Sequence, residues 1–205
     1  MPTLHFFYDV VCPFAYLAST QVERVAAAHR AELRWRPFLL GGVFRHLYAD
    51  GRAPMEHMSP AKARHNLLDM HRWAELWKVP FAMPVGHPFR TVTAMRAVVA
   101  APDVVRASHA LFRAYWVSGL DVSKGDVVAT ALDDVGLDGA AIVARTNDAD
   151  IKDRLRLVTD EAIEAGVFGA PAFLVEREGW TSEIFWGQDR LALVEDALLR
   201  GRDAA

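Results

Sequence analysis

The chain has 205 residues, 52% of them hydrophobic, which is enough to bury the core of one ordinary domain or of a small domain with an insertion. A formal net charge of −3 at pH 7, with no basic run, gives no electrostatic case for binding nucleic acid or an anionic membrane surface. A single cysteine excludes an intramolecular disulfide and a cysteine-based zinc site, and no histidine spacing predicts a metal. Without a secretory signal pattern or an apolar run of roughly 20 residues, we expect a cytoplasmic protein.

The first forty residues predict a strand, a helix and a second strand. Residues 3–11 form a continuous apolar run that is typical of a buried strand, and a helical pattern covers residues 13–30. Residues 32–38 alternate polar and apolar side chains until a proline stops the strand. Because a helix joins the two strands, we expect them to be parallel in a right-handed βαβ unit.

The middle of the chain predicts helices. Residues 39–60 have loop and short-helix signals, with Gly41 and Gly42 among the breakers. Ser59 and Pro60 have the pattern of an N-cap followed by a proline in the first helical position, so we expect a helix from there to Trp77. Its expected apolar side comprises Leu67, Leu68, Met70, Trp73, Ala74 and Trp77. Further helices are expected over 90–101, 102–118, 123–135 and 138–165.

The end of the chain returns to strand patterns. Residues 172–176 and 182–186 flank a glycine-containing turn and predict a hairpin, and a last helix is expected over 189–200. The order βαβ, helical block, ββα is that of a thioredoxin-like fold with a large all-helical insertion. We therefore predict an α/β protein with a thioredoxin-like domain of residues 1–40 and 166–205 and a helical insertion domain of residues 41–165.

Cys12 lies where the first strand meets the first helix. Unpaired N–H groups and a partial positive charge at a helix N-terminus favour an anion. A thiol in this place tends to have a lowered pKa and to be reactive. Ala15 occupies the position three residues on, where a dithiol would need its second cysteine. The pattern predicts thiolate chemistry without a dithiol.

Three parts of the chain carry a family resemblance. They are residues 6–18 (FFYDVVCPFAYLA), residues 36–44 (RPFLLGGVF), and the C-terminal pair 167–173 (VFGAPAF) and 185–191 (FWGQDRL). In order and spacing these segments resemble 2-hydroxychromene-2-carboxylate isomerases, which are relatives of kappa-class glutathione transferases and, more distantly, of DsbA-type oxidoreductases. The resemblance implies a glutathione-dependent cis-trans/ring-opening isomerase, a small 2-hydroxychromene-2-carboxylate-like aromatic carboxylate as substrate, and a homodimer.

The resemblance places glutathione against two C-terminal segments. In thioredoxin-like folds a proline such as Pro171 is cis, and it exposes the backbone N–H and C=O of Ala170 to an extended peptide. Gln188 and Asp189 open the last helix, where N–H groups suit a carboxylate and Asp189 can take the γ-glutamyl ammonium. The alternatives are an ordinary strand-start proline and an Asp189 that only caps its helix.

Three further positions are expected at the site. The resemblance places a glutathione-contacting lysine at Lys62, whose cation can pair with the glycyl carboxylate or stabilise a thiolate; the alternative is a solvated surface lysine. Arg90 stands where many relatives have asparagine, and its guanidinium can bind a substrate carboxylate or make a surface ion pair. Phe14 is expected in the wall of the substrate pocket, and the other wall candidates are Tyr16, Trp73, Trp77 and Phe89.

The chain departs from the family pattern at two places. A glycine-asparagine pair that relatives often have is missing around Tyr48-Ala49-Asp50. Relatives also usually have serine at the position of Cys12, where the hydroxyl donates a hydrogen bond to the glutathione thiolate. A thiol is the weaker donor, and it can instead attack oxidised glutathione and form a mixed disulfide; an inert buried cysteine is the remaining alternative.

Three functions therefore stay open. The first is a glutathione-dependent isomerase, which predicts that Cys12→Ser keeps or raises activity. The second is a monothiol DsbA-like oxidoreductase or kappa-type glutathione transferase that uses Cys12, which predicts that the same change abolishes activity. The third is a non-catalytic binding protein on the same scaffold, which predicts ligand binding without turnover and an unreactive thiol.

Overall fold

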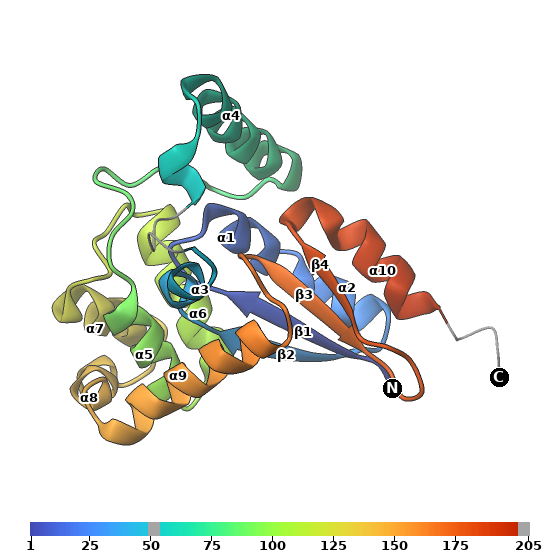
Figure 1. The fold of residues 1–205 in the computed structure, drawn as a ribbon. Coiled ribbons are helices and arrows are strands. Elements are labelled where there is room, and N and C mark those ends of the chain that lie inside the picture. Colours follow the sequence, from blue (N-terminus) through green and yellow to red (C-terminus); the bar gives the residue numbers. More distant parts are fainter. Residues whose placement is uncertain (49–53, 201–205) are drawn as a thin grey trace.

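The two ends of the chain build one four-stranded sheet, and helices occupy the described residues between them (Figure 1). The computed structural model describes residues 1–48 and 54–200. The strands β1 (Thr3–Tyr8), β2 (Glu32–Pro37), β3 (Ala172–Glu176) and β4 (Glu183–Trp186) lie in the order β2-β1-β3-β4. β1 and β2 are parallel, whereas β1–β3 and β3–β4 are antiparallel. The predicted α/β, thioredoxin-like fold with a helical insertion is confirmed.

The helices follow one another along the chain as ten α-helices and two short 3₁₀ turns within the described residues. Their bounds are α1 Pro13–Ser19, α2 Val22–Ala28, α3 Leu40–Leu47, η1 Pro54–His57, α4 Pro60–Trp77, α5 Val92–Ala100, α6 Val104–Trp116, α7 Gly125–Asp133, α8 Gly139–Arg145, α9 Ala149–Glu164, η2 Gln188–Arg190 and α10 Leu191–Leu199. Within the described residues no helix is both long and apolar enough to cross a membrane.

β1 is buried on both faces, which explains its continuous apolar run. Phe6 packs edge-on against Trp35 of β2 (ring centroids 5.0 Å apart) and stacks on Phe173 of β3 (5.6 Å). The strand ends at Tyr8, three residues before its predicted end. The cause is a turn in which the backbone N–H of Cys12 donates to the carbonyl of Asp9 at 3.0 Å.

Two of the predicted helices are each divided in the structure, and side chains that bond the backbone explain both breaks. Residues 13–30 form α1 and α2, separated where the Thr20 hydroxyl donates to the Leu17 carbonyl at 2.7 Å. Residues 138–165 form α8 and α9, separated where the Thr146 hydroxyl donates to the Val143 carbonyl at 2.7 Å. Hydroxyl groups that bond nearby carbonyls compete with the helical ladder, so the expectation of single helices is wrong.

The prediction that Gly41 and Gly42 break the chain is also wrong, because both lie in α3. A Cβ at residue 42 would come 3.0 Å from the side chain of Thr159 in α9. The Thr159 hydroxyl also accepts the N–H of Leu39 at 3.1 Å. The glycine therefore lets α3 approach α9 closely, and tertiary packing overrides the low helix propensity of glycine.

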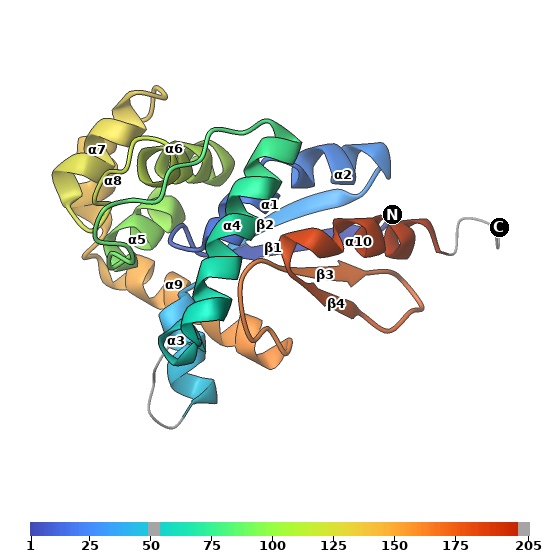
Figure 2. The same cartoon turned by 90° about the horizontal axis from the view of Figure 1, so that it is seen from above.

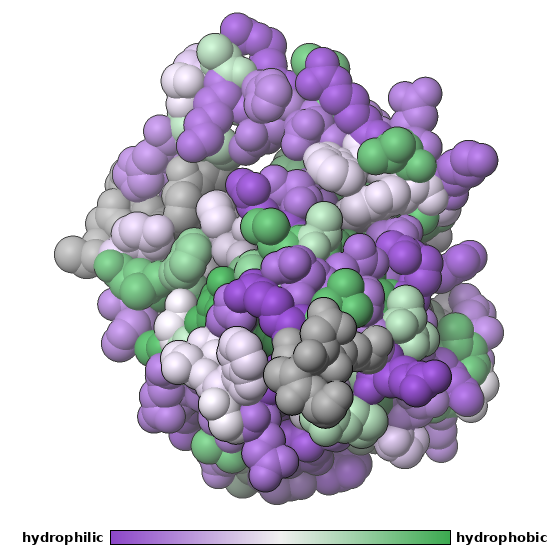
Figure 3. Space-filling view, turned by 90° about the vertical axis from the view of Figure 1, so that its right-hand side faces the viewer, coloured by the Kyte–Doolittle hydropathy of each residue, from purple (hydrophilic) through white to green (hydrophobic). Residues whose placement is uncertain are grey.

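α4 has the predicted bounds, with the Ser59 hydroxyl accepting the Lys62 N–H at 3.3 Å. In Figure 1 it lies above α1 and apart from the sheet, and in the view from above it crosses in front of them (Figure 2). Its predicted apolar side is only partly right, because Leu67 and Leu68 are 41% and 55% exposed. Ala74 is buried against the body of the molecule. A hollow runs beneath α4 in the space-filling view (Figure 3).

The helical insertion and the sheet share one core. The Tyr8 hydroxyl of β1 hydrogen-bonds Ser108 of α6 at 2.5 Å, and the Trp116 indole N–H donates to the Val10 carbonyl at 2.8 Å. Tyr8, Val10 and Trp116 are fully buried members of that core, and Ser108 is a buried polar residue beside them. The division at residues 40/41 and 165/166 stays a prediction.

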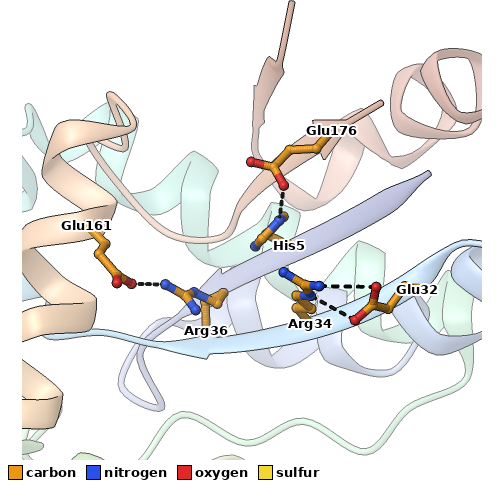
Figure 4. A network of polar contacts seen from close by, with 6 residues as sticks. All are labelled: His5, Glu32, Arg34, Arg36, Glu161 and Glu176. Carbon is orange, nitrogen blue, oxygen red and sulfur yellow. Dashed lines mark hydrogen bonds and ion pairs between the residues drawn. The ribbon is translucent and has the colours of Figure 1, made fainter. Parts of the chain in front are cut away.

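The opposite face of the sheet has a network of ion pairs (Figure 4). His5 of β1 contacts Glu176 of β3 at 2.8 Å, and Arg36 of β2 pairs with Glu161 of α9. Glu32 and Arg34 pair along β2 at 2.8 Å. These pairs tie β1 to β3 and β2 to α9, so they fix α9 against this face.

Two glycines make a matched test of the packing. A methyl group at Gly139 would overlap the Ala129 backbone where α8 meets α7, whereas Gly41 in α3 has open space around the same position. We expect Gly139→Ala to lower the free energy of unfolding by about 2 kcal/mol or more. We expect Gly41→Ala to raise it by about 0.5–1 kcal/mol because alanine is the better helix former. Urea unfolding measures both, and equal effects of the two changes would contradict this packing.

Candidate functional site

Cys12 is the N-cap of α1, as the sequence predicts. Its carbonyl accepts the N–H of Tyr16 at 3.0 Å, and Pro13 takes the first helical position. The side chain makes no capping hydrogen bond to the helix and is only 7% exposed. The thiol is therefore largely shielded from solvent, and its hydrogen bond is made to another part of the chain.

That other part is the loop before β3. The Cys12 thiol donates a hydrogen bond to the Ala170 carbonyl at 3.1 Å, and the Ala170–Pro171 peptide bond is cis. The expected cis-proline is confirmed. The thiol takes one acceptor position of the Ala170 carbonyl, and the expected opening of this carbonyl to a peptide stays a prediction. The Ala170 N–H makes no backbone hydrogen bond among the described residues, so it is the group that stays open to a ligand.

Burial raises the pKa of the Cys12 thiol to about 12. The backbone N–H groups of Ala15 and Phe14 act in the opposite direction but do not offset the loss of solvent, and the nearby Asp9 carboxylate raises the pKa further. The predicted lowering of this pKa is therefore wrong. Near neutral pH the group is a protonated thiol, which is a hydrogen-bond donor rather than a nucleophile.

Asp9 lies beneath this thiol and was not identified from the sequence pattern. It is 1% exposed, and burial raises the pKa of its carboxyl group to about 6. The carboxylate accepts the N–H of Val11 at 3.2 Å, the N–H of Leu40 at 3.0 Å and the hydroxyl of Thr91 at 3.1 Å. The only signal in the sequence is an acidic residue at the end of an apolar strand.

Gln188 and Asp189 lie beside the cis-proline loop. The Gly187 N–H donates to the Pro171 carbonyl at 3.0 Å, which joins the end of β4 to the start of β3, and η2 packs against α1. Gln188 is 5% exposed, whereas the Asp189 side chain is 40% exposed and lies 3.5 Å from Arg190. Neither η2 nor α10 has a side-chain cap, so Asp189 is not a simple N-cap.

Lys62 and Arg90 lie on the surface, and no described contact joins either of them to Cys12. Neither side chain has an ion pair within the described residues. Lys62 lies four residues before Asn66 and eleven before Trp73, on the α4 face whose later positions are partly buried. Arg90 precedes Thr91, which binds Asp9, so its backbone lies close to the turn that carries Cys12.

The aromatic candidates separate into core and partly exposed residues. Tyr16 is core, because it is 4% exposed and its hydroxyl donates to the Pro80 carbonyl at 2.6 Å. Phe14 is half-buried on the first turn of α1. Trp73 and Trp77 are half-buried on α4 with their rings 4.9 Å apart. Phe89 packs on Tyr115 and is also partly buried.

Two of the remaining expectations concern the 48–50 segment and metals. Ala49 and Asp50 lie outside the described residues, so only Tyr48 is placed, at the end of α3. In the parts of the chain that the structure describes, no group of three or more histidine, cysteine, aspartate or glutamate side chains is arranged to hold a metal ion.

The family model of the DSBA-like thioredoxin domain matches residues 3–199, and the chain belongs to this family. It is 26% identical to a 2-hydroxychromene-2-carboxylate isomerase of Sphingobium xenophagum, over 96% of this chain and 98% of the relative. It is 30% identical to glutathione S-transferase kappa 2 of Caenorhabditis elegans, over 94% and 90%. The solved structure of a 2-hydroxychromene-2-carboxylate isomerase superposes with a TM-score of 0.82 at 22% identity, over 99% of both chains. The predicted resemblance is confirmed.

The environment of Cys12 predicts a slow thiol. At pH 7.5 we expect iodoacetamide to alkylate Cys12 at least roughly tenfold more slowly than it alkylates free glutathione, because burial opposes both ionisation and access. Mass spectrometry follows the reaction at a single site, since the chain has no other cysteine. Protein unfolded in urea is the control and should react like a free thiol. A native rate equal to that of glutathione would contradict the structure.

Proposed function

We propose that the protein is a glutathione-dependent isomerase that acts on a 2-hydroxychromene-2-carboxylate-like aromatic carboxylate. Its relatives include enzymes named 2-hydroxychromene-2-carboxylate isomerase and kappa-class glutathione transferases. Glutathione is its cofactor, and it works as a cytoplasmic homodimer. The observation that carries the proposal is the hydrogen bond from the Cys12 thiol to Ala170, because it places a protonated donor at the N-terminus of α1 beside the cis-proline loop.

The bound glutathione replaces the Ala170 carbonyl as the partner of Cys12. The glutathione backbone pairs with the Ala170 N–H at Pro171, and its thiolate accepts the hydrogen bond from Cys12. A donor to the thiolate favours the charged form and lowers the pKa of the glutathione thiol. The N–H groups of Phe14 and Ala15 face the same position and add to this effect.

The charged ends of glutathione have partners of opposite charge. Asp189 takes the γ-glutamyl ammonium beside Gln188, whose backbone lies at the start of η2. Lys62 takes the glycyl carboxylate across the hollow beneath α4. Arg90, which has no ion pair within the described residues, binds the substrate carboxylate, and the half-buried Phe14 forms part of the aromatic wall.

The reaction proceeds by addition and elimination. The hemiketal ring of the substrate first opens: its ring C–O bond breaks, the ring oxygen takes a proton to become a phenol, and the 2-hydroxyl loses a proton to become a ketone conjugated with the C=C bond. The glutathione thiolate then adds to the electron-poor end of this C=C bond, so a C–S bond forms and the C=C bond becomes single, with the electron pair delocalised onto the ketone. Rotation about the single bond follows. The electron pair then re-forms the double bond and expels the thiolate, so glutathione is regenerated.

A kappa-type transferase is the second candidate, supported by the 30% identity to a kappa glutathione transferase. It uses the same thiolate, which displaces a leaving group from the substrate. Glutathione is then consumed as part of the conjugate. The monothiol oxidoreductase is less favoured, because it needs Cys12 itself as the thiolate and burial raises the pKa of that thiol to about 12.

The experiment incubates the protein with 2-hydroxychromene-2-carboxylate, with and without reduced glutathione, and follows substrate, isomer and glutathione by chromatography. We expect the isomer to form only with glutathione and the glutathione concentration to stay constant. Cys12→Ser should keep or raise the rate, since a hydroxyl is the stronger donor. Consumption of glutathione into a conjugate would favour the transferase, and binding without turnover would overturn the enzyme assignment.

Calorimetric titration with reduced glutathione tests the cofactor site separately. We expect one-site binding that Asp189→Asn weakens roughly tenfold, because it removes a charged hydrogen bond. Asp196→Asn on the exposed side of α10 is the matched control and should bind like the wild type. Wild-type affinity in the Asp189 variant, or no binding of reduced glutathione by any variant, would contradict the proposed site.

A further inference from the structure

Asp9 connects three separate segments at the Cys12 position. Its backbone carbonyl accepts the N–H of Cys12 at 3.0 Å and so closes the turn before α1. Its carboxylate accepts the N–H of Leu40 at the start of α3 and the hydroxyl of Thr91 at the start of α5. The second carboxylate oxygen accepts the N–H of Val11, inside the same turn. One side chain therefore sets the position of Cys12 relative to both α3 and α5.

This carboxylate is buried without a cation. Within the described residues it has no ion pair with lysine, arginine or histidine, and all three of its donors are neutral. Neutral donors stabilise a buried carboxylate but do not cancel its negative charge. A second negative charge nearby is therefore disfavoured. The Cys12 thiol is a group of the site that can acquire a like charge, and the charge of Asp9 opposes its ionisation.

We propose that Asp9 is the positioning residue of the Cys12 site: its carboxylate holds the turn in place, and its negative charge keeps the thiol protonated as a hydrogen-bond donor. The inference deepens the proposed function, on which it rests for the use of that donor toward glutathione. The ionisations of Asp9 and Cys12 are coupled, because a negative charge on one group disfavours a negative charge on the other.

The other titratable groups that face Asp9 do not ionise in the same pH range. On β1 and α6, burial raises the pKa of Tyr8 and raises that of Tyr115 to about 12, and the Asp9 charge adds to both shifts. From α3 and the start of α5 the facing groups are the backbone of Leu40 and the neutral hydroxyl of Thr91. The ring Nδ1 of His87 lies 2.8 Å from the Tyr115 hydroxyl, and burial lowers the pKa of this histidine. The alkylation rate reports only the Cys12 thiol, and the Asp9 variant separates the effect of Asp9 from that of His87.

The coupling predicts a break in the pH profile of Cys12 reactivity. Below pH 6 Asp9 is neutral, so the thiolate fraction rises tenfold with each pH unit. As Asp9 becomes charged near pH 6 it disfavours the thiolate, so the rise flattens over up to about one pH unit and then resumes at the same slope on a lower line. A thiol with no such neighbour would rise at the same slope through the whole range.

The experiment measures the iodoacetamide alkylation rate of Cys12 from pH 5 to 9 without glutathione, so its outcome is independent of the cofactor and the substrate. We expect the break near pH 6 in the wild type. In Asp9→Asn the break should disappear, and the rate at pH 8 should rise roughly three- to tenfold. A wild-type profile without a break, or the same break in Asp9→Asn, would overturn the proposal.

Two further variants separate charge from structure. Thr91→Val keeps the Asp9 charge but removes a donor that lowers its pKa, so the break should move to higher pH rather than disappear. Asp103→Asn changes an exposed carboxylate at the start of α6 and should reproduce the wild-type profile. Near-UV circular dichroism checks folding; if Asp9→Asn does not fold, an unmoved break in Thr91→Val overturns the proposal.

Discussion

The hydrogen bond from the Cys12 thiol to the Ala170 carbonyl joins the two halves of the sheet at the point where the site forms. Cys12 follows β1 and Ala170 precedes β3, and these antiparallel neighbours are 158 residues apart in the sequence. The Gly187 N–H then links Pro171 to the start of η2. The thiol, the cis-proline loop and Asp189 are neighbours because the strands that carry them are paired.

Burial decides what this thiol can do. A helix N-terminus favours a thiolate, but its effect is worth at most about 2 kcal/mol. Desolvation of a buried charge is larger, and the Asp9 carboxylate acts in the same direction, so the pKa of Cys12 rises to about 12. A protonated thiol can still donate a hydrogen bond. A hydrogen-bond donor needs no second cysteine, and the chain has none.

The sequence predicts those features that depend on local patterns. The strands near residues 3 and 32, the N-cap at Ser59 and the hairpin around Gly179 are all present. The cis-proline at Pro171, which the resemblance to thioredoxin-like folds implies, is also present. Local patterns do not show which of several competing hydrogen bonds and packing contacts forms in the folded chain. The hydroxyls of Thr20 and Thr146 divide two helices, and Gly42 is helical because α9 packs against it.

The largest miss is the buried carboxylate of Asp9, since its three donors come from residues 11, 40 and 91 and only the folded chain brings them together. The same holds for the protonation of Cys12, which depends on burial by distant segments. Lys62 and Arg90 are surface residues, and their roles toward a ligand stay predictions.

The central claim is that Cys12 donates a hydrogen bond to a glutathione thiolate, and the ionisation of bound glutathione tests it most directly. Absorbance near 240 nm reports thiolate, and below pH 9 Cys12 itself contributes little. The account predicts that saturated wild-type and Cys12→Ser complexes ionise glutathione at a pH below that of a free thiol, about 8.5. It predicts that the Cys12→Ala complex does so at higher pH than both. Equal ionisation in all three complexes would contradict a donor role for Cys12.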